Sequence, residues 1–97
     1  MFTIDLSDDA LEELRQFRKR DSTIILDDVE RQLTYQPNVE TRNRKPLRAH
    51  PLGERELRID KFRVFYDIDT EGETVLVKAV GVKLGNKLFI RGKEFPL

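Results

Sequence analysis

Three residues in the middle of the chain have side chains suited to chemistry on a phosphate group: Glu56, Arg58 and Arg63. Arginine binds phosphate through a planar fork of N–H donors, and a carboxylate can accept a proton from a hydroxyl group. RNA supplies its own nucleophile, the 2′-hydroxyl. A protein therefore only has to align it, accept its proton and neutralise the charge that develops. These residue types permit RNA cleavage without a metal or another cofactor.

Other catalytic chemistries find little support in the residues. The chain has no cysteine, which excludes thiolate chemistry and disulfides, and its one histidine is His50. The acidic residues at 67, 69, 71 and 73 flank a predicted turn without the spacing of a calcium loop, so we expect them to be solvated. No serine lies in a strand–turn–helix elbow, and a glycine-rich phosphate loop is absent.

A short basic segment precedes the three residues. It covers residues 42–48 (RNRKPLR) and holds four positive charges, at Arg42, Arg44, Lys45 and Arg48. The chain has no net charge, yet residues 1–39 hold 5 Lys/Arg against 9 Asp/Glu, whereas residues 78–97 hold 5 against 1. Such a polarised molecule can present a basic face to phosphates. A solvated loop explains the basic segment equally well.

The periodicity of apolar residues predicts the element order β-α-α-β-β-β. The strands are expected at residues 2–6, 54–60, 62–69 and 74–82. Ser7 is expected to cap a helix that closes at Arg20, and Asp21-Ser22 to break the chain before a second helix that Pro37 ends. Helices first and strands afterwards predict an α+β fold, with a helical hairpin packed on one face of an antiparallel sheet.

The alternation along residues 62–69 separates two faces of this sheet. Its alternate apolar side chains, at residues 62, 64, 66 and 68, are expected to face the helices. Arg63 and Phe65 then lie on an open face beside Glu54, Glu56 and Arg58. On that face Phe65 could stack on a base. The alternative is a solvated sheet face with cross-strand Arg–Glu pairs.

The chain length of 97 residues predicts a single domain over residues 1–97 with a modest core. Residues 37–53 are interpreted as a long loop, and residues 92–97 are expected to trail at the surface. The apolar residues 88–90 either close the sheet edge or remain free for a partner helix. The amino terminus lacks a signal-peptide pattern and no apolar run is long enough to span a membrane, so we expect a cytoplasmic protein.

Residues 56–69 (ELRIDKFRVFYDID) and 75–83 (VLVKAVGVK) resemble the RelE/ParE superfamily of toxins from type II toxin–antitoxin systems. The shared features are a strand ending in basic Arg58, a tight turn, an aromatic–Arg–hydrophobic–hydrophobic–Tyr strand, and a glycine-containing strand followed by basic Lys83. The resemblance implies a fold like that of microbial ribonucleases. RelE-like members cut mRNA in the ribosomal A site through the 2′-hydroxyl, whereas ParE-like members inhibit DNA gyrase. An antitoxin neutralises both.

The resemblance also implies roles for single residues. Arg63 matches the strand arginine that stabilises the transition state, and Lys83 falls where many members have an arginine proposed as general acid. Phe89 falls where many members have a tyrosine that stacks on an mRNA base. Glu54 and Glu56 stand where RelE toxins have two lysines, which reverses the local charge. Either Glu56 is the general base, or the protein is not an efficient ribonuclease.

We therefore predict a ribosome-dependent mRNA endonuclease with Arg63, Lys83 and Glu56 as catalytic residues and no metal or other cofactor. The predicted RNA-binding residues are Arg42, Arg44, Lys45, Arg48, Arg58 and Phe89. The expected partners are a cognate antitoxin, mRNA and the ribosome, with operator DNA bound only through the antitoxin complex and no membrane. The alternatives are a ParE-like gyrase inhibitor and a catalytically weakened binding protein.

Overall fold

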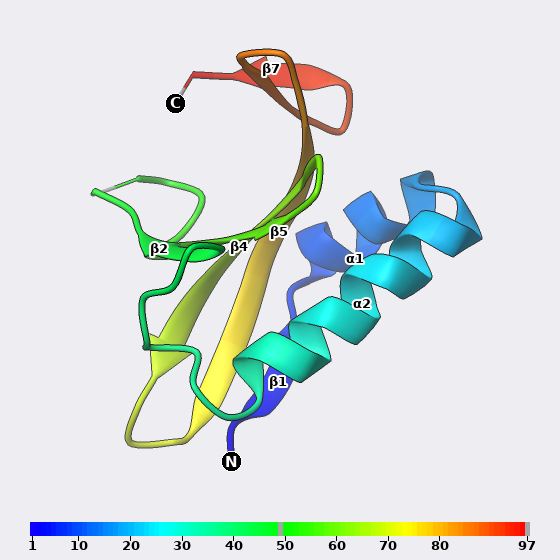
Figure 1. The fold of residues 1–97 in the computed structure, drawn as a ribbon. Coiled ribbons are helices and arrows are strands. Elements are labelled where there is room, and N and C mark those ends of the chain that lie inside the picture. Colours follow the sequence, from blue (N-terminus) through cyan, green and yellow to red (C-terminus); the bar gives the residue numbers. More distant parts are fainter. Residues whose placement is uncertain (49, 97) are drawn as a thin grey trace.

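The structure, a computed structural model, describes residues 1–48 and 50–96. Its elements are β1 (Thr3–Leu6), α1 (Asp8–Gln16), α2 (Lys19–Leu33), β2 (Arg44–Pro46), β3 (Arg55–Ile59), β4 (Phe62–Asp69), β5 (Thr74–Leu84), β6 (Lys87–Ile90) and β7 (Lys93–Phe95). The two helices lie together on one face of a curved sheet (Figure 1). The predicted α+β fold is therefore confirmed, with β2, β6 and β7 as additional short strands.

The sheet has the strand order β2-β3-β4-β5-β6-β7, and β1 pairs with β5. Residues 74–77 of β5 pair with β1 and residues 82–84 pair with β6, so both neighbours share one edge of β5. All pairings are antiparallel except β1–β5, which is parallel. The predicted antiparallel sheet is thus correct apart from β1, which runs parallel to its neighbour β5.

The helices begin and end at different residues from those predicted. Ser7 caps α1 as expected, accepting a hydrogen bond from the backbone N–H of Ala10 at 3.0 Å. The break between the helices lies at Phe17 and Arg18, where the backbone is extended, so the predicted break at Asp21-Ser22 is wrong. Ser22 lies inside α2 and its hydroxyl donates to the Leu14 carbonyl at 2.6 Å, which ties the helices together. In the described part of the chain, no helix is long and apolar enough to cross a membrane.

The main core lies between the helices and the sheet. Its central buried residues are Ala10, Leu14, Ile25, Val29, Leu33, Leu57, Phe62, Val64, Tyr66, Val75 and Val77. The predicted parity of β4 is therefore confirmed. Tyr66 also fixes the chain after α2, since its hydroxyl donates to the Pro37 carbonyl at 2.9 Å, and burial raises the pKa of Tyr66 to about 12.

A second, smaller apolar cluster lies on the other face of the sheet. Phe65, Ala79, Leu88 and Ile90 form it, with Leu47, Leu52 and Phe95 packed against them. The chain after β5 forms the β6–β7 hairpin over this face rather than trailing from it (Figure 1). Phe65 is 0% exposed, so the expectation that it stacks on a base is wrong. Leu97 of the predicted tail and Ala49 of the predicted loop lie outside the described residues.

Candidate active site

The open face of the sheet brings together the three residues that the sequence singled out. Arg58 of β3 and Arg63 of β4 are paired across the strands. The Glu56 carboxylate lies between them, with Oε1 3.5 Å from Arg63 Nε and Oε2 3.6 Å from Arg58 Nε. Glu56 is only 6% exposed. One buried carboxylate thus faces two guanidinium groups, which leaves the cluster with an excess positive charge.

Arg63 is held more firmly than Arg58. Its Nη1 donates to the carbonyl oxygens of Asp60 at 2.7 Å and Phe62 at 2.9 Å. Burial lowers the pKa of Arg63, Glu56 opposes this change, and Arg58 adds to it. The guanidinium still remains protonated, because its pKa lies far above neutral pH. Arg63 is therefore a fixed and partly desolvated cation, and such a charge attracts an anion more strongly than one in bulk water.

Within the described residues, the Nε atoms of Arg58 and Arg63 are buried and lack a hydrogen-bond partner. Their distances to Glu56 are ion-pair distances and exceed those of normal N–H···O hydrogen bonds. Buried donors are usually paired, and unpaired ones in a native protein indicate a binding or catalytic role or an ordered solvent molecule. The cluster can therefore accept a further anionic oxygen.

Two lysines complete the basic surroundings. Lys45 of β2 is paired with Glu56 across the strands, and residues opposite each other in an antiparallel pair face the same side. Gly81 of β5 is paired with Arg63, so Lys83, two residues further along β5, also lies on that side. Its backbone N–H donates to the Lys61 carbonyl at 2.7 Å. The predicted residues Lys45, Glu56, Arg58, Arg63 and Lys83 thus share the open face.

Two of the predicted RNA-binding residues lie on the helix side of the sheet instead. Arg44 is nearly buried, and its Nη1 donates to the Gln32 carbonyl near the end of α2 at 2.6 Å. Phe89 is paired with Val82, whose side chain packs on the main core, and it lines a cavity of about 320 Å³ with Phe17. Neither residue reaches the open face, because the period of two turns both side chains away from it.

The remaining predicted residues lie further from the cluster. Arg42 is exposed in the segment before β2. Arg48 lines a second pocket on the open face together with Glu54 and Asp67. Glu54 donates its backbone N–H to the Asp67 carboxylate at 2.8 Å, and its side chain makes none of the ion pairs around Arg63. Of the two glutamates in the position of family lysines, only Glu56 belongs to the candidate site.

Sequence reasoning missed a second buried carboxylate, Glu13 of α1, which is 3% exposed. Its Oε1 accepts a hydrogen bond from the Val80 backbone N–H at 2.7 Å, in the part of the β5 edge that neither β1 nor β6 covers. Its Oε2 lies 3.4 Å from Arg91 Nε. Burial raises the pKa of Glu13. The helical pattern hides this role, because Glu13 is buried only through contact with a strand 67 residues away.

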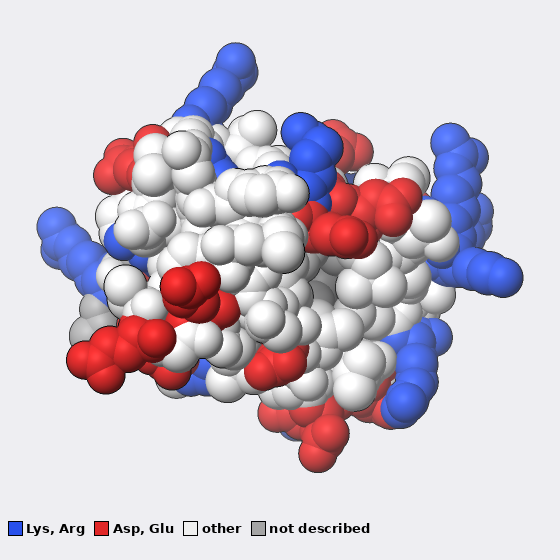
Figure 2. Space-filling view, turned by 90° about the horizontal axis from the view of Figure 1, so that it is seen from below, with Lys and Arg blue, Asp and Glu red and all other residues white. Residues whose placement is uncertain are grey.

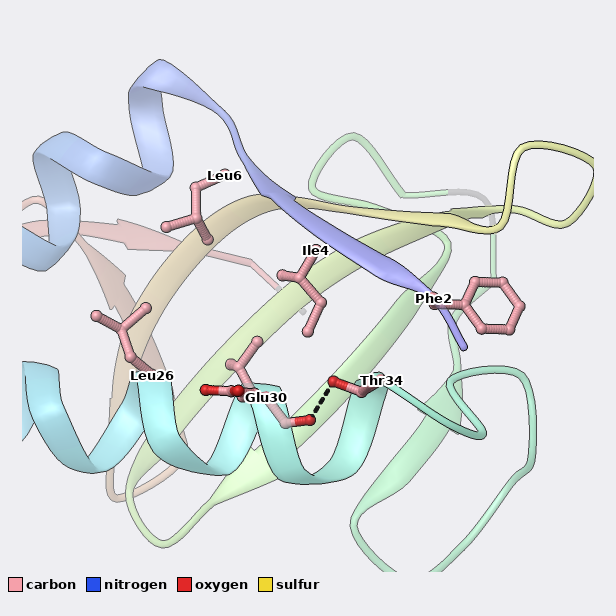
Figure 3. A pocket seen from close by; sticks show the side chains of 7 residues that line it. Phe2, Ile4, Leu6, Leu26, Glu30 and Thr34 are labelled. Atoms are coloured by element: carbon pink, nitrogen blue, oxygen red, sulfur yellow. Dashed lines mark hydrogen bonds between the residues drawn. The ribbon is translucent and has the colours of Figure 1, made fainter.

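An apolar groove lies on the opposite side of the molecule, between β1 and α2. Its volume is about 420 Å³. Ile4, Leu6 and Leu26 line it together with the polar residues Glu30 and Thr34 (Figure 3). The end of the molecule that carries the amino terminus shows acidic groups around an uncharged area, with Lys and Arg side chains extending from its rim (Figure 2). This end is therefore unsuited to bind a polyanion.

The chain has a small α+β fold with an arginine–carboxylate cluster on its open face, and comparison with known proteins identifies its class as a RelE/ParE-type toxin. Residues 4–82 match the family model described as ParE toxin of type II toxin–antitoxin system, parDE. The chain belongs to this family and is a toxin of a toxin–antitoxin system. A search of curated proteins finds no match.

Two solved structures are similar to this chain. One is the toxin–antitoxin complex RelBE2 from Mycobacterium tuberculosis, with a TM-score of 0.68 and 26% identity over 84% of this chain and 98% of that one. The other is the isolated E. coli RelE toxin, with a TM-score of 0.69 and 21% identity over 87% of this chain and 86% of that one. The second likeness concerns the fold alone.

Proposed function

We propose that this toxin is a ribosome-dependent, metal-free mRNA endonuclease that inhibits translation. The observation that carries the proposal is the buried carboxylate of Glu56 between Arg58 and Arg63, on a sheet face that also holds Lys45 and Lys83. A strongly held arginine beside a carboxylate supplies the two functions that 2′-hydroxyl attack requires, which are charge stabilisation and proton acceptance.

In the proposed reaction, the scissile phosphate binds at the Nε–H groups of Arg58 and Arg63, which lack hydrogen-bond partners in the described residues. The phosphate competes with Glu56 for the positive charge of the two arginines, and the Glu56 carboxylate then accepts the proton of the 2′-hydroxyl. The 2′-oxygen forms a bond to phosphorus while the bond from phosphorus to the 5′-oxygen breaks. Lys83 donates a proton to the leaving oxygen, and Arg63 stabilises the charge on the pentacoordinate phosphorus. The products are a 2′,3′-cyclic phosphate and a 5′-hydroxyl.

The RNA on either side of the cut is proposed to follow the basic residues of the segment before β3. Arg42 and Arg48 are exposed, and Lys45 is half-buried beside Glu56. Lysine and arginine contacts to phosphates are independent of sequence and weaken as the salt concentration rises. These three residues are proposed to supply affinity that does not depend on the RNA sequence.

A cognate antitoxin is the proposed protein partner, and operator DNA is reached only through it. The RelBE2 structure is a complex of this kind. The β1–α2 groove suits an extended segment of such a partner, since in the described part of the chain β1 has a strand only on its β5 side. Thr3 and Ser7 direct their N–H groups towards β5, so the outward groups of Ile4 remain for a partner strand. Ile4→Pro should weaken antitoxin binding, whereas Ile4→Val should retain it.

The decisive experiment supplies purified toxin to stalled ribosome–mRNA complexes and measures cleavage by primer extension. Arg63→Ala should reduce the cleavage rate by about a hundredfold or more, which is typical for loss of a group that stabilises transition-state charge. Arg15→Ala is the matched control, because Arg15 is exposed and, among the described residues, forms an ion pair with Glu12 alone, on α1. Full activity of Arg63→Ala contradicts the proposed site.

Inhibition of DNA gyrase is the second candidate function. The specific observation in its favour is the family model, which describes ParE toxins. In addition, this chain has Glu54 and Glu56 at the two positions where RelE toxins have lysines, which departs from the RelE pattern. A supercoiling assay with purified gyrase separates the two candidates: inhibition of supercoiling with intact ribosome-bound mRNA supports the ParE-like function.

A further inference from the structure

The two-residue turn between β3 and β4 makes an unusual set of contacts with the candidate site. Three consecutive carbonyl oxygens are used: those of Asp60 and Phe62 accept hydrogen bonds from Arg63 Nη1, at 2.7 and 2.9 Å. The carbonyl between them, that of Lys61, accepts the backbone N–H of Lys83 at 2.7 Å. One turn therefore contacts the guanidinium of Arg63 and the backbone of Lys83, the two residues that supply the cations of the proposed reaction.

The backbone of this turn is restrained at Asp60, which has a φ of 53°. Asparagine, aspartate and glycine adopt such a left-handed conformation readily, whereas a β-branched residue is strongly disfavoured there. The direction of the Asp60 carbonyl depends on this conformation. If residue 60 changes to an extended backbone, its carbonyl turns away from Arg63, and the path of Lys61 towards Lys83 changes with it.

We propose that Asp60 is a positioning residue, whose left-handed backbone conformation fixes Arg63 and Lys83 relative to each other at the scissile phosphate. This inference rests on the proposed endonuclease function. Asp60 itself touches neither the RNA nor the reacting atoms. It acts mainly through its carbonyl and through the turn that it shapes, because its carboxylate has the smallest of the electrostatic effects on the pKa of Arg63.

The test compares Asp60→Val with Asp60→Gly and Asp60→Asn, using single-turnover cleavage on stalled ribosome–mRNA complexes. Asp60→Val should lower the rate at saturating toxin about ten- to a hundredfold, the effect expected from misplacing a group by about 1 Å. The toxin concentration for half-maximal rate should change by less than about twofold, because phosphate contacts outside the turn dominate affinity. Asp60→Gly and Asp60→Asn should cut at the wild-type rate.

Glu73→Val is the matched control. Glu73 has a φ of 49° in the turn between β4 and β5, so valine introduces the same strain away from the candidate site. Equal losses in Asp60→Val and Glu73→Val attribute the effect to general strain and overturn the inference. Losses in Asp60→Gly and Asp60→Asn as large as that of Asp60→Val attribute it to the carboxylate charge and also overturn it.

A second readout does not depend on the enzymatic activity. In NMR spectra of the arginine side chains, the Arg63 guanidinium N–H signals should be protected from exchange in the wild type and in Asp60→Gly, and lose that protection in Asp60→Val. Unchanged protection in Asp60→Val contradicts the inference. If the wild-type toxin does not cut mRNA while the Arg63 signals respond as expected, the endonuclease proposal fails and the positioning role of the turn stands.

Discussion

The molecule contains two buried glutamates that face arginine, and their surroundings differ. Glu13, on the helix side, accepts a 2.7 Å hydrogen bond from the Val80 backbone N–H and lies 3.4 Å from Arg91. In the described residues, the ion pairs of Glu56, on the open side, are with Arg63 and Arg58, at 3.5 and 3.6 Å. Glu13 pairs a backbone group that would otherwise be unpaired at a gap in the sheet edge. Within the described residues, the Glu56 carboxylate accepts no hydrogen bond from the backbone, and the Nε atoms of Arg58 and Arg63 have no hydrogen-bond partner.

This difference teaches which buried charge supports the fold and which supports a reaction. A carboxylate that accepts a hydrogen bond from a buried backbone N–H contributes to stability, because without it that N–H is buried and unpaired. A carboxylate held by ion pairs alone, without a backbone donor, can respond to an arriving anion, although its removal also costs stability. We therefore expect substitutions at Glu13 to change unfolding and substitutions at Glu56 to change cleavage.

The largest expected effect follows the change Glu56→Gln. Without a proton acceptor, the cleavage rate on ribosome-bound mRNA should fall about 10²- to 10⁴-fold, the range for general acid–base catalysis. The free energy of unfolding should fall as well, by at most about 3–5 kcal/mol, because the Glu56–Arg63 pair is buried, so cleavage is expressed per folded molecule. Rate measurements together with urea unfolding test this expectation. A large loss of stability with normal cleavage per folded molecule would assign Glu56 to the fold instead.

Glu13→Ala should lower the free energy of unfolding and leave cleavage intact. The free energy of unfolding should fall by about 1–3 kcal/mol, because the Val80 N–H loses its partner in a buried position. Cleavage per folded molecule should remain within about twofold of the wild type. Urea denaturation measures the first quantity and single-turnover kinetics the second. An unchanged unfolding curve contradicts the structural role of Glu13.

The pH dependence of stability sharpens the comparison further. Burial raises the pKa of Glu13 above its ordinary value of 4.5, so the folded protein binds the proton of this group more tightly than the unfolded chain does. The contribution of Glu13 to stability therefore falls as the pH rises from 4.5 through the folded-state pKa. In Glu13→Gln this fall is absent. The difference in unfolding free energy between the two proteins should change across this pH range, and a constant difference counts against the shift.

The smallest expected effect belongs to Arg91→Ala. The Arg91 side chain is 43% exposed, and both its contacts, with Asp9 and Glu13, are 3.4 Å long. The pair with Asp9 is exposed and contributes about 0–1 kcal/mol, and Glu13 keeps its hydrogen bond from Val80 when Arg91 is removed, so thermal unfolding should shift only slightly. A loss as large as that of Glu13→Ala would indicate that the ion pair, rather than the Val80 hydrogen bond, is the main interaction of Glu13.

The sequence predicted the features that depend on local pattern. The Ser7 cap, the parity of β4 and the placement of Glu56, Arg58 and Arg63 on one face follow from periods of two and 3.6 residues. The sequence failed where distant segments decide. Phe65 is buried because distant apolar residues such as Leu47, Leu52 and Leu88 cover it, and Glu13 because the β5 edge has a gap.

The two predicted residues on the wrong side of the sheet, Arg44 and Phe89, show the same limit. Each follows a segment without a readable period, so its parity could not be assigned from the sequence. The family resemblance placed Phe89 at a base-stacking position, but the pairing of β6 with β5 directs its side chain towards α1. A change of one residue in register reverses the face that a side chain occupies.

The most direct test of the central claim, that the Glu56–Arg58–Arg63 cluster cuts RNA through its 2′-hydroxyl, is chemical analysis of the cleaved ends. Ribosome-bound mRNA should be cut into fragments that carry a 2′,3′-cyclic phosphate and a 5′-hydroxyl. The reaction is run at the lowest magnesium concentration that keeps the ribosomes intact. Mock-treated complexes and Arg63→Ala should yield no such ends. Intact mRNA, or fragments with a 3′-hydroxyl and a 5′-phosphate, would contradict the account.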